Sequence, residues 1–359
     1  MSQMSDQGMG FGGFLLGLGV GWYVFRYITA DVNMIGYLLI LAGAGIIINA
    51  FLSRGRRRSP LQGLFGGLIG GLFLALFITQ GFGIVNEITD VFTDVDLGTY
   101  RATRTYTLDT PVTAESITLD VENVNGGIDV SSWSGDHVKF DIEVKARGST
   151  TAEAEANLDR FTHSLEDSVS GTTQRISLNF PITSSEWSNY AVIVDVYVPE
   201  GVADEISLQT TNGEISVQGL STQELMIDTT NGRVSLMDVE ASVIQVETTN
   251  GAITGTVTSP STSFSVTNGG IEMTLGTASG EHQFSATNGA IDLSLPTGAN
   301  VGYSIDLDTS VGSIDVNLPN MSYDVDKART KKGETVGYDA KEIQISISAD
   351  TTIGSIDLN

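Results

Sequence analysis

The chain has 359 residues, with 43 acidic and 18 basic side chains and no cysteine. The absence of cysteine excludes disulfides, iron–sulfur clusters and thiolate metal sites. Only two acids and five bases precede residue 87, so 41 acids and 13 bases remain after that point. Such an acidic segment repels nucleic acid and anionic lipid headgroups, and we expect no nucleic-acid partner.

Three apolar stretches open the chain, at residues 11–29, 34–52 and 61–85. Each approaches or exceeds the ~20 residues that a helix needs to cross the hydrocarbon core of a bilayer. The arginine-rich loop at 54–58 marks the cytoplasmic side. The pattern predicts a three-helix anchor over residues 1–86, embedded in the lipid bilayer of the cell membrane. Its N-terminus lies inside the cell, and the C-terminal domain lies outside the cytoplasm.

Glycines recur at every fourth position in the first and third stretches, at Gly13, Gly17 and Gly21 and at Gly63, Gly67 and Gly71. Glycines at this spacing let helix backbones approach closely. We expect them to pack the two helices together within one chain. Self-association in the membrane is the alternative.

Three parts are predicted to follow the anchor: a polar stalk (87–112), a β-rich region (113–200) and a repeat domain (201–359). Within the β-rich region, residues 150–169 carry Ala, Leu and Phe at spacings of three and four, which predicts one amphipathic helix. Such a helix would cover an end or face of the sheet and protect an open edge.

The repeat domain is built on a recurring Thr-Asn-Gly phrase followed two residues later by Ile or Val. Its asparagines are Asn212, Asn231, Asn250, Asn268 and Asn288, separated by 19, 19, 18 and 20 residues. A fixed period indicates stacked supersecondary units. Asn-Gly makes tight corners or hairpin turns, because both residues tolerate positive φ. The sequence therefore fits a β-solenoid, one coil per repeat, or an antiparallel meander, and the regular corners favour the solenoid.

In a solenoid, one row of aliphatic side chains points into the core: Ile215, Val234, Ile253, Ile271, Ile291 and Ile314. The polar, basic stretch 327–337 is predicted to be a loop inserted between the last two coils. The fold class is thus all-β, a repeat β-solenoid with one amphipathic helix, preceded by three transmembrane helices.

An outward row in this arrangement ends in carboxylates at Glu272, Asp292 and Asp315. Stacked carboxylates repel unless cations or water screen them, so these residues are candidate ligands for loosely bound Ca²⁺. The alternative is a solvated acidic face. Outside the regular repeats, Trp133, Trp187 and Tyr190 could stack on sugar rings or pack into the core.

The Thr-Asn-Gly-x-Ile-x-Leu repeat, the preceding Ala/Glu-rich helix and the Val-Pro-x-Gly turn at Val198–Gly201 resemble the "putative adhesin" domain family of bacteria and archaea. The resemblance covers about residues 113–359. It implies a β-solenoid-like fold, exposure at the cell surface, and a role in adhesion or envelope-stress sensing. The family offers no catalytic residues to transfer.

We therefore expect a membrane-anchored, extracytoplasmic protein that is not an enzyme and needs no cofactor. Its leading function is adhesin-like binding of a surface glycan or envelope protein, or an envelope-structural role. An envelope-stress sensor acting through a membrane partner is the alternative. A glycan-active enzyme is the third reading, because β-solenoids can carry polysaccharide-cleaving sites.

Overall fold

The computed structural model describes Leu15 and residues 100–359. Residues 98–359 form one compact unit, in which strands from the predicted β-rich region and from the predicted repeat domain belong to the same stack. The predicted anchor and its glycine series lie outside the described residues, apart from Leu15. Among the residues that are described, no helix is long and apolar enough to cross a membrane.

Residues 100–359 are all-β, as predicted, with one α-helix. The helices are α5 (Thr151–Arg160) and two single 3-10 turns, η1 (Trp187–Asn189) and η2 (Tyr338–Ala340).

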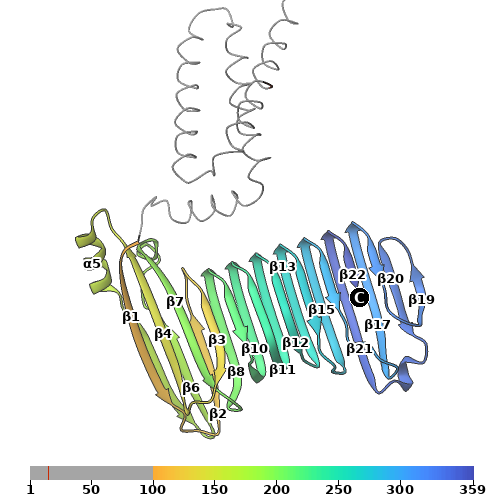
Figure 1. The fold of residues 1–359 in the computed structure, drawn as a ribbon, viewed down its shortest axis with the longest axis horizontal. Helices are drawn as coiled ribbons and strands as arrows, with labels where there is room; N and C mark the ends of the chain where they lie inside the picture. The colour runs from red at the N-terminus through yellow and green to blue at the C-terminus, as the bar shows by residue number, and fades with distance from the viewer. Residues whose placement is uncertain (1–14, 16–99) are drawn as a thin grey trace, which may run out of the picture. The chain divides into compact units, whose positions relative to one another are not determined.

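The strands form two faces that pack against each other (Figure 1). Face A holds the strands that lead into the Asn-Gly corners and their edge strands. In spatial order these are β5 (Ser164–Ser170), β6 (Thr173–Asn179), β2 (Ser116–Glu122), β8 (Ala203–Asn212), β10 (Ser221–Asn231), β11 (Val234–Asn250), β13 (Ser261–Asn268), β15 (Gly280–Asn288), β21 (Ile343–Ile353), β17 (Val301–Val311), β20 (Thr330–Thr335) and β19 (Met321–Asp326).

Face B holds the strands that leave the corners, together with its own edge strands. They are β1 (Tyr100–Pro111), β4 (His137–Arg147), β7 (Tyr190–Pro199), β3 (Ile128–Trp133), β9 (Ile215–Gln218), the first residues of β11, β12 (Ile253–Thr258), β14 (Ile271–Leu275), β16 (Ile291–Ser294), β22 (Ile356–Leu358) and β18 (Ile314–Val316). Strand β11 runs through both faces.

Neighbouring coils pair in parallel with a register of one repeat. Asn231 lies beside Asn212 on one side and Asn250 on the other. The same register continues to Asn268 and Asn288. Parallel pairing between repeats excludes the antiparallel meander and is the arrangement predicted for a β-solenoid.

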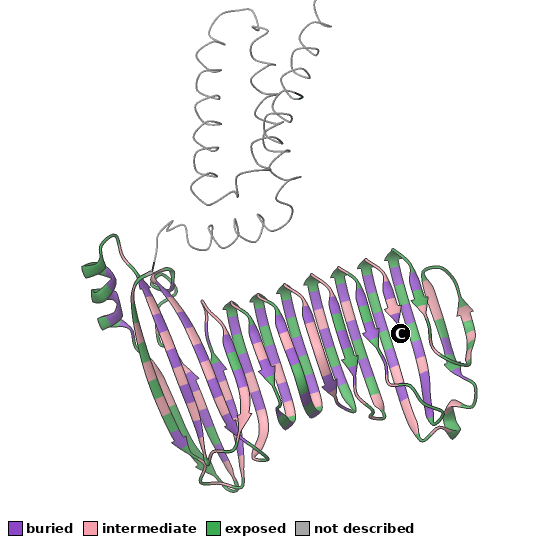
Figure 2. Cartoon of the chain, in the orientation of Figure 1, coloured by how far each residue is buried: buried purple, intermediate pink, exposed green. Residues whose placement is uncertain are grey.

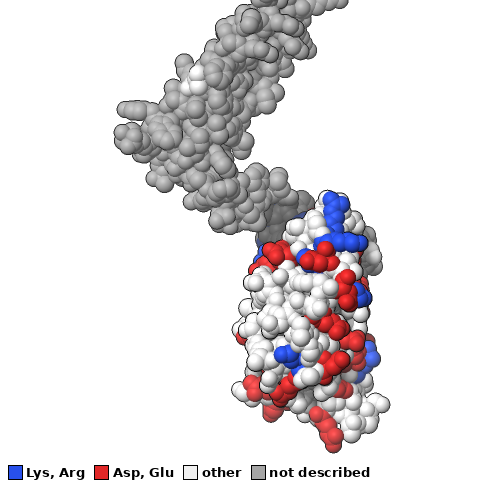
Figure 3. All heavy atoms as spheres, turned by 90° about the vertical axis from the view of Figure 1, so that its right-hand side faces the viewer, with Lys and Arg blue, Asp and Glu red and all other residues white. Residues whose placement is uncertain are grey.

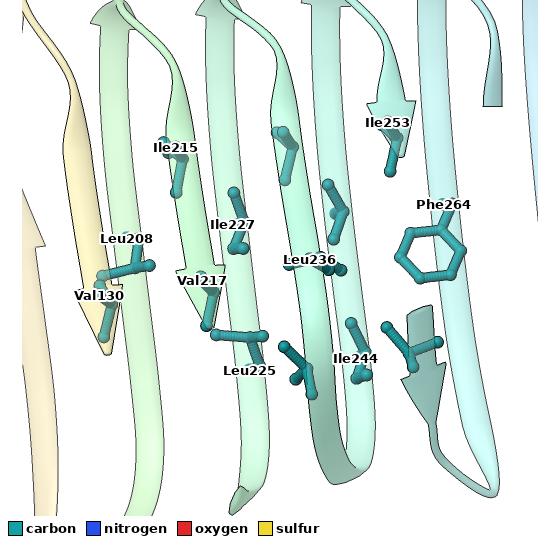
Figure 4. Close-up of a cluster of buried hydrophobic side chains, with 14 of the residues drawn as sticks. Val130, Leu208, Ile215, Val217, Leu225, Ile227, Leu236, Ile244, Ile253 and Phe264 are labelled. Carbon is teal, nitrogen blue, oxygen red and sulfur yellow. The ribbon is translucent and has the colours of Figure 1, made fainter. Parts of the chain in front are cut away.

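The core lies between the two faces, because alternate residues of each strand point inward. Figure 2 shows this as alternating buried and less buried bands along the strands. Figure 4 shows Leu208 and Ile227 of face A and Ile215 and Leu236 of face B in one buried cluster. The predicted inward row is buried throughout, with Ile128 added at its start and Ile356 between Ile291 and Ile314.

The N-terminal end of face B is closed by antiparallel strands, β4 on β7 and β1 on β4. The predicted stalk is therefore wrong over residues 100–111. These residues form the edge strand β1, because they alternate in burial and pair along the whole of β4.

Helix α5 confirms the predicted helix but is shorter, ending at Arg160. Its first turn is capped by Thr150, whose hydroxyl accepts a hydrogen bond from the Glu153 N–H at 3.2 Å. The rest of the predicted segment forms β5, because residues 164–170 pair with β6 at the edge of face A. Backbone pairing outweighs the local helical pattern here.

The last coil is not at the end of the stack. Strand β21 lies between β15 and β17, and β22 lies between β16 and β18. The predicted loop 327–337 is wrong, since Thr330–Thr335 form β20, which pairs antiparallel with β17. Strand β20 pairs with one edge of β17. Strand β21 of the final coil pairs with the other edge and lies between β17 and β15.

The hairpin β19–β20 closes face A at the C-terminal end. The strand pair carries charged side chains. Lys331 forms an ion pair with Asp326 within the hairpin, and Lys332 forms one with Asp306 of β17 at 3.0 Å. Figure 3 views this end of the stack and shows basic and acidic side chains together on it. Charged edge strands of this kind oppose further sheet pairing.

Candidate functional site

The Asn-Gly corners form a continuous ladder along one edge of the stack. Each asparagine donates from Nδ2 to Oδ1 of the asparagine in the preceding coil, at 2.8–2.9 Å. The structure thus places the five sequence-predicted corner residues above one another. It adds Asn125 as a sixth member at the N-terminal end.

The corner glycines allow the coils to stack. A Cβ on Gly232 would lie 1.7 Å from the Gly213 carbonyl oxygen, and one on Gly251 would lie 1.9 Å from that of Gly232. Buried threonines add a second set of hydrogen bonds between the coils. Thr229 and Thr248, two residues before their asparagines, donate to the Gly213 and Gly232 oxygens at 3.4 and 3.2 Å. The ladder therefore has a structural role, because it holds successive coils in register.

The predicted cation row is rearranged by the inserted coil. Glu272 pairs in register with Asp292, but Asp292 pairs with Asp357, and only Asp357 pairs with Asp315. The predicted adjacency of Asp292 and Asp315 is therefore wrong. Among the described residues, no group of three or more His, Asp or Glu side chains is arranged to hold a metal ion.

A hollow of about 410 Å³ opens on the outer surface of face A near the corners. Its lining comes from the ends of β2, β8 and β10 and from the segment that follows β6. The lining residues are Glu122, Asn123, Val124, Asn179, Phe180, Pro181, Trp187, Gln209, Thr210, Thr211, Asp228 and Thr230. Carboxylate, amide and hydroxyl groups line this hollow beside an apolar wall formed by Phe180, Pro181 and Trp187. No Lys or Arg side chain lines the hollow.

The wall of the hollow is held by aromatic packing. Phe180 contacts Trp187 edge-to-face, with ring centroids 6.2 Å apart. The ring centroids of Phe161 and Phe180 are 5.7 Å apart. The Trp187 carbonyl accepts a hydrogen bond from Asn125 Nδ2 at 2.8 Å. The Tyr190 hydroxyl donates to the Asn157 carbonyl at 2.8 Å. These contacts fix the wall against both the helix and the corner ladder.

A second hollow of about 230 Å³ continues along face A. It shares Gln209 and Asp228 with the first hollow and reaches Gln245 and Glu247 on β11. Glu122, Gln209, Asp228 and Glu247 are register neighbours on successive strands, so they form one row. We call the two hollows together the face A groove.

The three aromatic residues singled out from the sequence, Trp133, Trp187 and Tyr190, differ in burial and in their packing partners. Trp187 and Tyr190 are buried and pack in the aromatic cluster, as the packing alternative expects. Trp133 is half-buried and packs edge-on against His137, with centroids 4.6 Å apart, and obliquely against Tyr197. Only Trp187 lines the groove.

A smaller hollow of about 160 Å³ on face B lies between Asp129 and Asp195, which are register neighbours on β3 and β7. Partial burial raises the pKa of Asp195, and the charges of Asp129 and Asp141 raise it further. Desolvation also raises the pKa of Asp129, followed by the charge of Glu214. The hollow therefore favours a proton or a cation over an anion.

A sequence profile of the Toastrack DUF4097 family matches residues 172–358 of the chain. The chain belongs to this family. The match runs from β6 to β22, so it includes the coils from β8 onward and the inserted last coil.

Several solved structures are similar to the toastrack domain. A "putative cell adhesion protein" from Clostridium sporogenes is 14% identical, with 71% of this chain and 99% of that chain covered and a TM-score of 0.38. "Putative adhesins" from Parabacteroides distasonis and Bacteroides fragilis are each 11% identical, with 71% and 97% covered and TM-scores of 0.32 and 0.27. No curated protein matches the chain.

The groove of the toastrack domain was not found from the sequence. Its residues come from β2, the end of β6, η1, β8, β10 and β11, several of which are far apart in the chain. Glu122 and Asn123 also precede the part that the family profile matches. The one local signal is the change from alternating residues to Asn-Phe-Pro after β6, which marks where the chain leaves the sheet.

Proposed function

We propose that this toastrack protein is a non-enzymatic, extracytoplasmic binding protein that holds a polyhydroxyl ligand, such as a neutral or amino-sugar glycan, in the face A groove. The observation that carries the proposal is the lining of the groove. Its larger hollow lies within the ~300–1,000 Å³ typical of small-molecule sites. An extended groove suits a chain-like ligand.

The chemistry of the lining selects the ligand class. Glu122, Gln209 and Asp228 offer acceptors and a donor in one row, and Thr211 and Thr230 add hydroxyls. Sugars present many hydroxyls to such groups. Because no Lys or Arg side chain lines the groove and three carboxylates do (Glu122, Asp228 and Glu247), an anionic glycan would be repelled.

Binding without catalysis is part of the proposal. Glu122 and Asp228 are both exposed to solvent, whereas a general acid for sugar chemistry needs a carboxyl in a desolvated setting. The predicted helical anchor supports placement outside the cytoplasm, because the arginine loop 54–58 precedes the third span. The sensor alternative stays a prediction, since no described residue bears on it.

The test is binding of the full-length chain to neutral, amino and anionic oligosaccharides, measured by calorimetry. We expect Asp228→Asn to weaken binding of a neutral or amino sugar by at least about tenfold, the effect of losing one hydrogen bond to a charged group. Gln209→Ala, which removes a neutral hydrogen-bonding group, should weaken binding by about fivefold. Glu272→Gln, an exposed change on face B, should leave binding unchanged. Binding of anionic sugars alone, equal binding by all variants, or release of cleaved sugar would contradict the proposal.

A further inference from the structure

The asparagine ladder is capped at one end only. At the N-terminal end, Asn125 donates to the Trp187 carbonyl at 2.8 Å and accepts from Asn212. At the other end, Asn288 donates to Asn268 at 2.9 Å. Its register neighbour in the next coil is Ile353, which has no amide to donate. Within residues 100–359, no side chain or backbone group donates to the Asn288 Oδ1, while each of the other ladder asparagines is held through both Nδ2 and Oδ1.

The Asn-Gly pairs of the ladder are open to a chemical reaction, the spontaneous deamidation of asparagine. In deamidation, the Gly backbone nitrogen loses its proton and bonds to the Asn Cγ. The Cγ–Nδ2 bond then breaks and ammonia leaves. Water opens the resulting succinimide to aspartate or isoaspartate. The Asn side chain must first rotate away from its hydrogen-bond partners, so each bond it makes raises the barrier.

The other determinants of reactivity are nearly the same at Asn250 and Asn288. Asn250 and Asn288 are both exposed and both precede Gly-Ala-Ile. The Gly251 and Gly289 N–H groups each donate to the next coil, at 3.0 and 2.9 Å. The two sites differ in the number of bonds held by the Asn side chain, two for Asn250 and one for Asn288.

The geometry points to Asn288–Gly289 as a spontaneous modification site, the first Asn-Gly pair of the folded chain to deamidate. The product carboxylate cannot donate to the Asn268 Oδ1, so it removes the last hydrogen bond of the ladder. Asn268 then becomes the new end with one bond. Deamidation is expected to proceed inward from this end, coil by coil.

The test is incubation of the folded full-length chain at mildly alkaline pH, followed by peptide mass spectrometry with isoaspartate quantification. We expect Asn288 to react about fivefold faster than Asn250, which is about 1 kcal/mol at 1.36 kcal/mol per tenfold in rate. In denaturant, the two sites should react at similar rates, because their local sequences match.

Ile353→Asn supplies the decisive variant, because it places a further asparagine before Gly354 at the next rung. It should slow reaction at Asn288 to the rate of Asn250 and move the fastest site to position 353. Thr352→Asn, one residue away from the ladder register, serves as the control and should leave Asn288 fastest. Equal rates at Asn250 and Asn288 in the folded wild type, or no slowing in Ile353→Asn, would overturn the inference.

Discussion

A single added carbon at Gly251 would collide with the neighbouring coil. Its Cβ would lie 1.9 Å from the Gly232 oxygen, and its φ is +157°. We expect Gly251→Ala to lower the free energy of unfolding by at least about 2 kcal/mol, measured by urea denaturation, because overpacking forces the coils apart.

Gly219→Ala is the matched control for this change. Gly219 has φ +61°, but nothing lies within 4 Å of the Cβ position. The left-handed backbone alone should cost about 1 kcal/mol. Equal losses for the two variants would show that close stacking at the corners is not what requires glycine.

His282 is the buried histidine of the described core. Burial lowers the pKa of His282 from its ordinary value of 6.5 to about 4, and its Nδ1 lies 3.0 Å from the Thr262 hydroxyl. Between these pH values the unfolded chain binds a proton that the folded chain excludes. The stabilising effect of neutral His282 is therefore complete above pH 6.5 and is lost as the pH falls towards 4.

We expect His282→Gln, which keeps a polar partner for Thr262 but does not titrate, to remove this part of the pH dependence. Within the window, wild type should lose about 1.4 kcal/mol per pH unit relative to the variant. Urea unfolding of both proteins at pH 7 and pH 5 measures the difference. Parallel stabilities at the two pH values would contradict the assignment.

At the scale of elements, the inserted last coil holds two parts of the stack together. Strand β21 pairs along its length with β15 on one side and with β17 on the other. Ile345 and Ile347 of this strand are buried in the core. Removing it would leave β15 and β17 two strand spacings apart, about 9.6 Å, which is too far for hydrogen bonds.

We therefore expect a chain that ends after residue 342 to lose the ordered structure of residues 301–335 as well. Limited proteolysis followed by mass spectrometry should show new cleavage within β17, β19 and β20, while β8 to β13 stay protected. A chain that ends after residue 358 is the control. Protection of β17 in the shorter chain would indicate a stack that does not depend on the inserted coil.

At the scale of the whole described unit, the fold is a one-dimensional stack in which each coil contacts its neighbours. Such a stack is stable only if its ends are closed. Antiparallel strands β4 and β1 close one end of face B, and β20 and β19 close the far end of face A. The face A groove lies where the capping segment after β6 meets the first regular coils, so capping and the proposed binding site share residues.

Much of the stack could be predicted from the sequence because its information is local and repeated. The Asn-Gly period set the register, and the inward row from Ile215 to Ile314 followed from alternation. The corner residues could also be placed above one another, because equal coil lengths bring equal positions together.

What only the tertiary structure decided depends on competition between strands for the same edge. Residues 100–111 and 164–170 became edge strands, and the final coil entered the stack between earlier ones. The face A groove likewise joins residues from six separate segments, β2, β6, η1, β8, β10 and β11, with the residues that follow β2 and β6. Periodicity shows that a segment can pair, but the free edge that it pairs with is determined by the other segments of the folded chain.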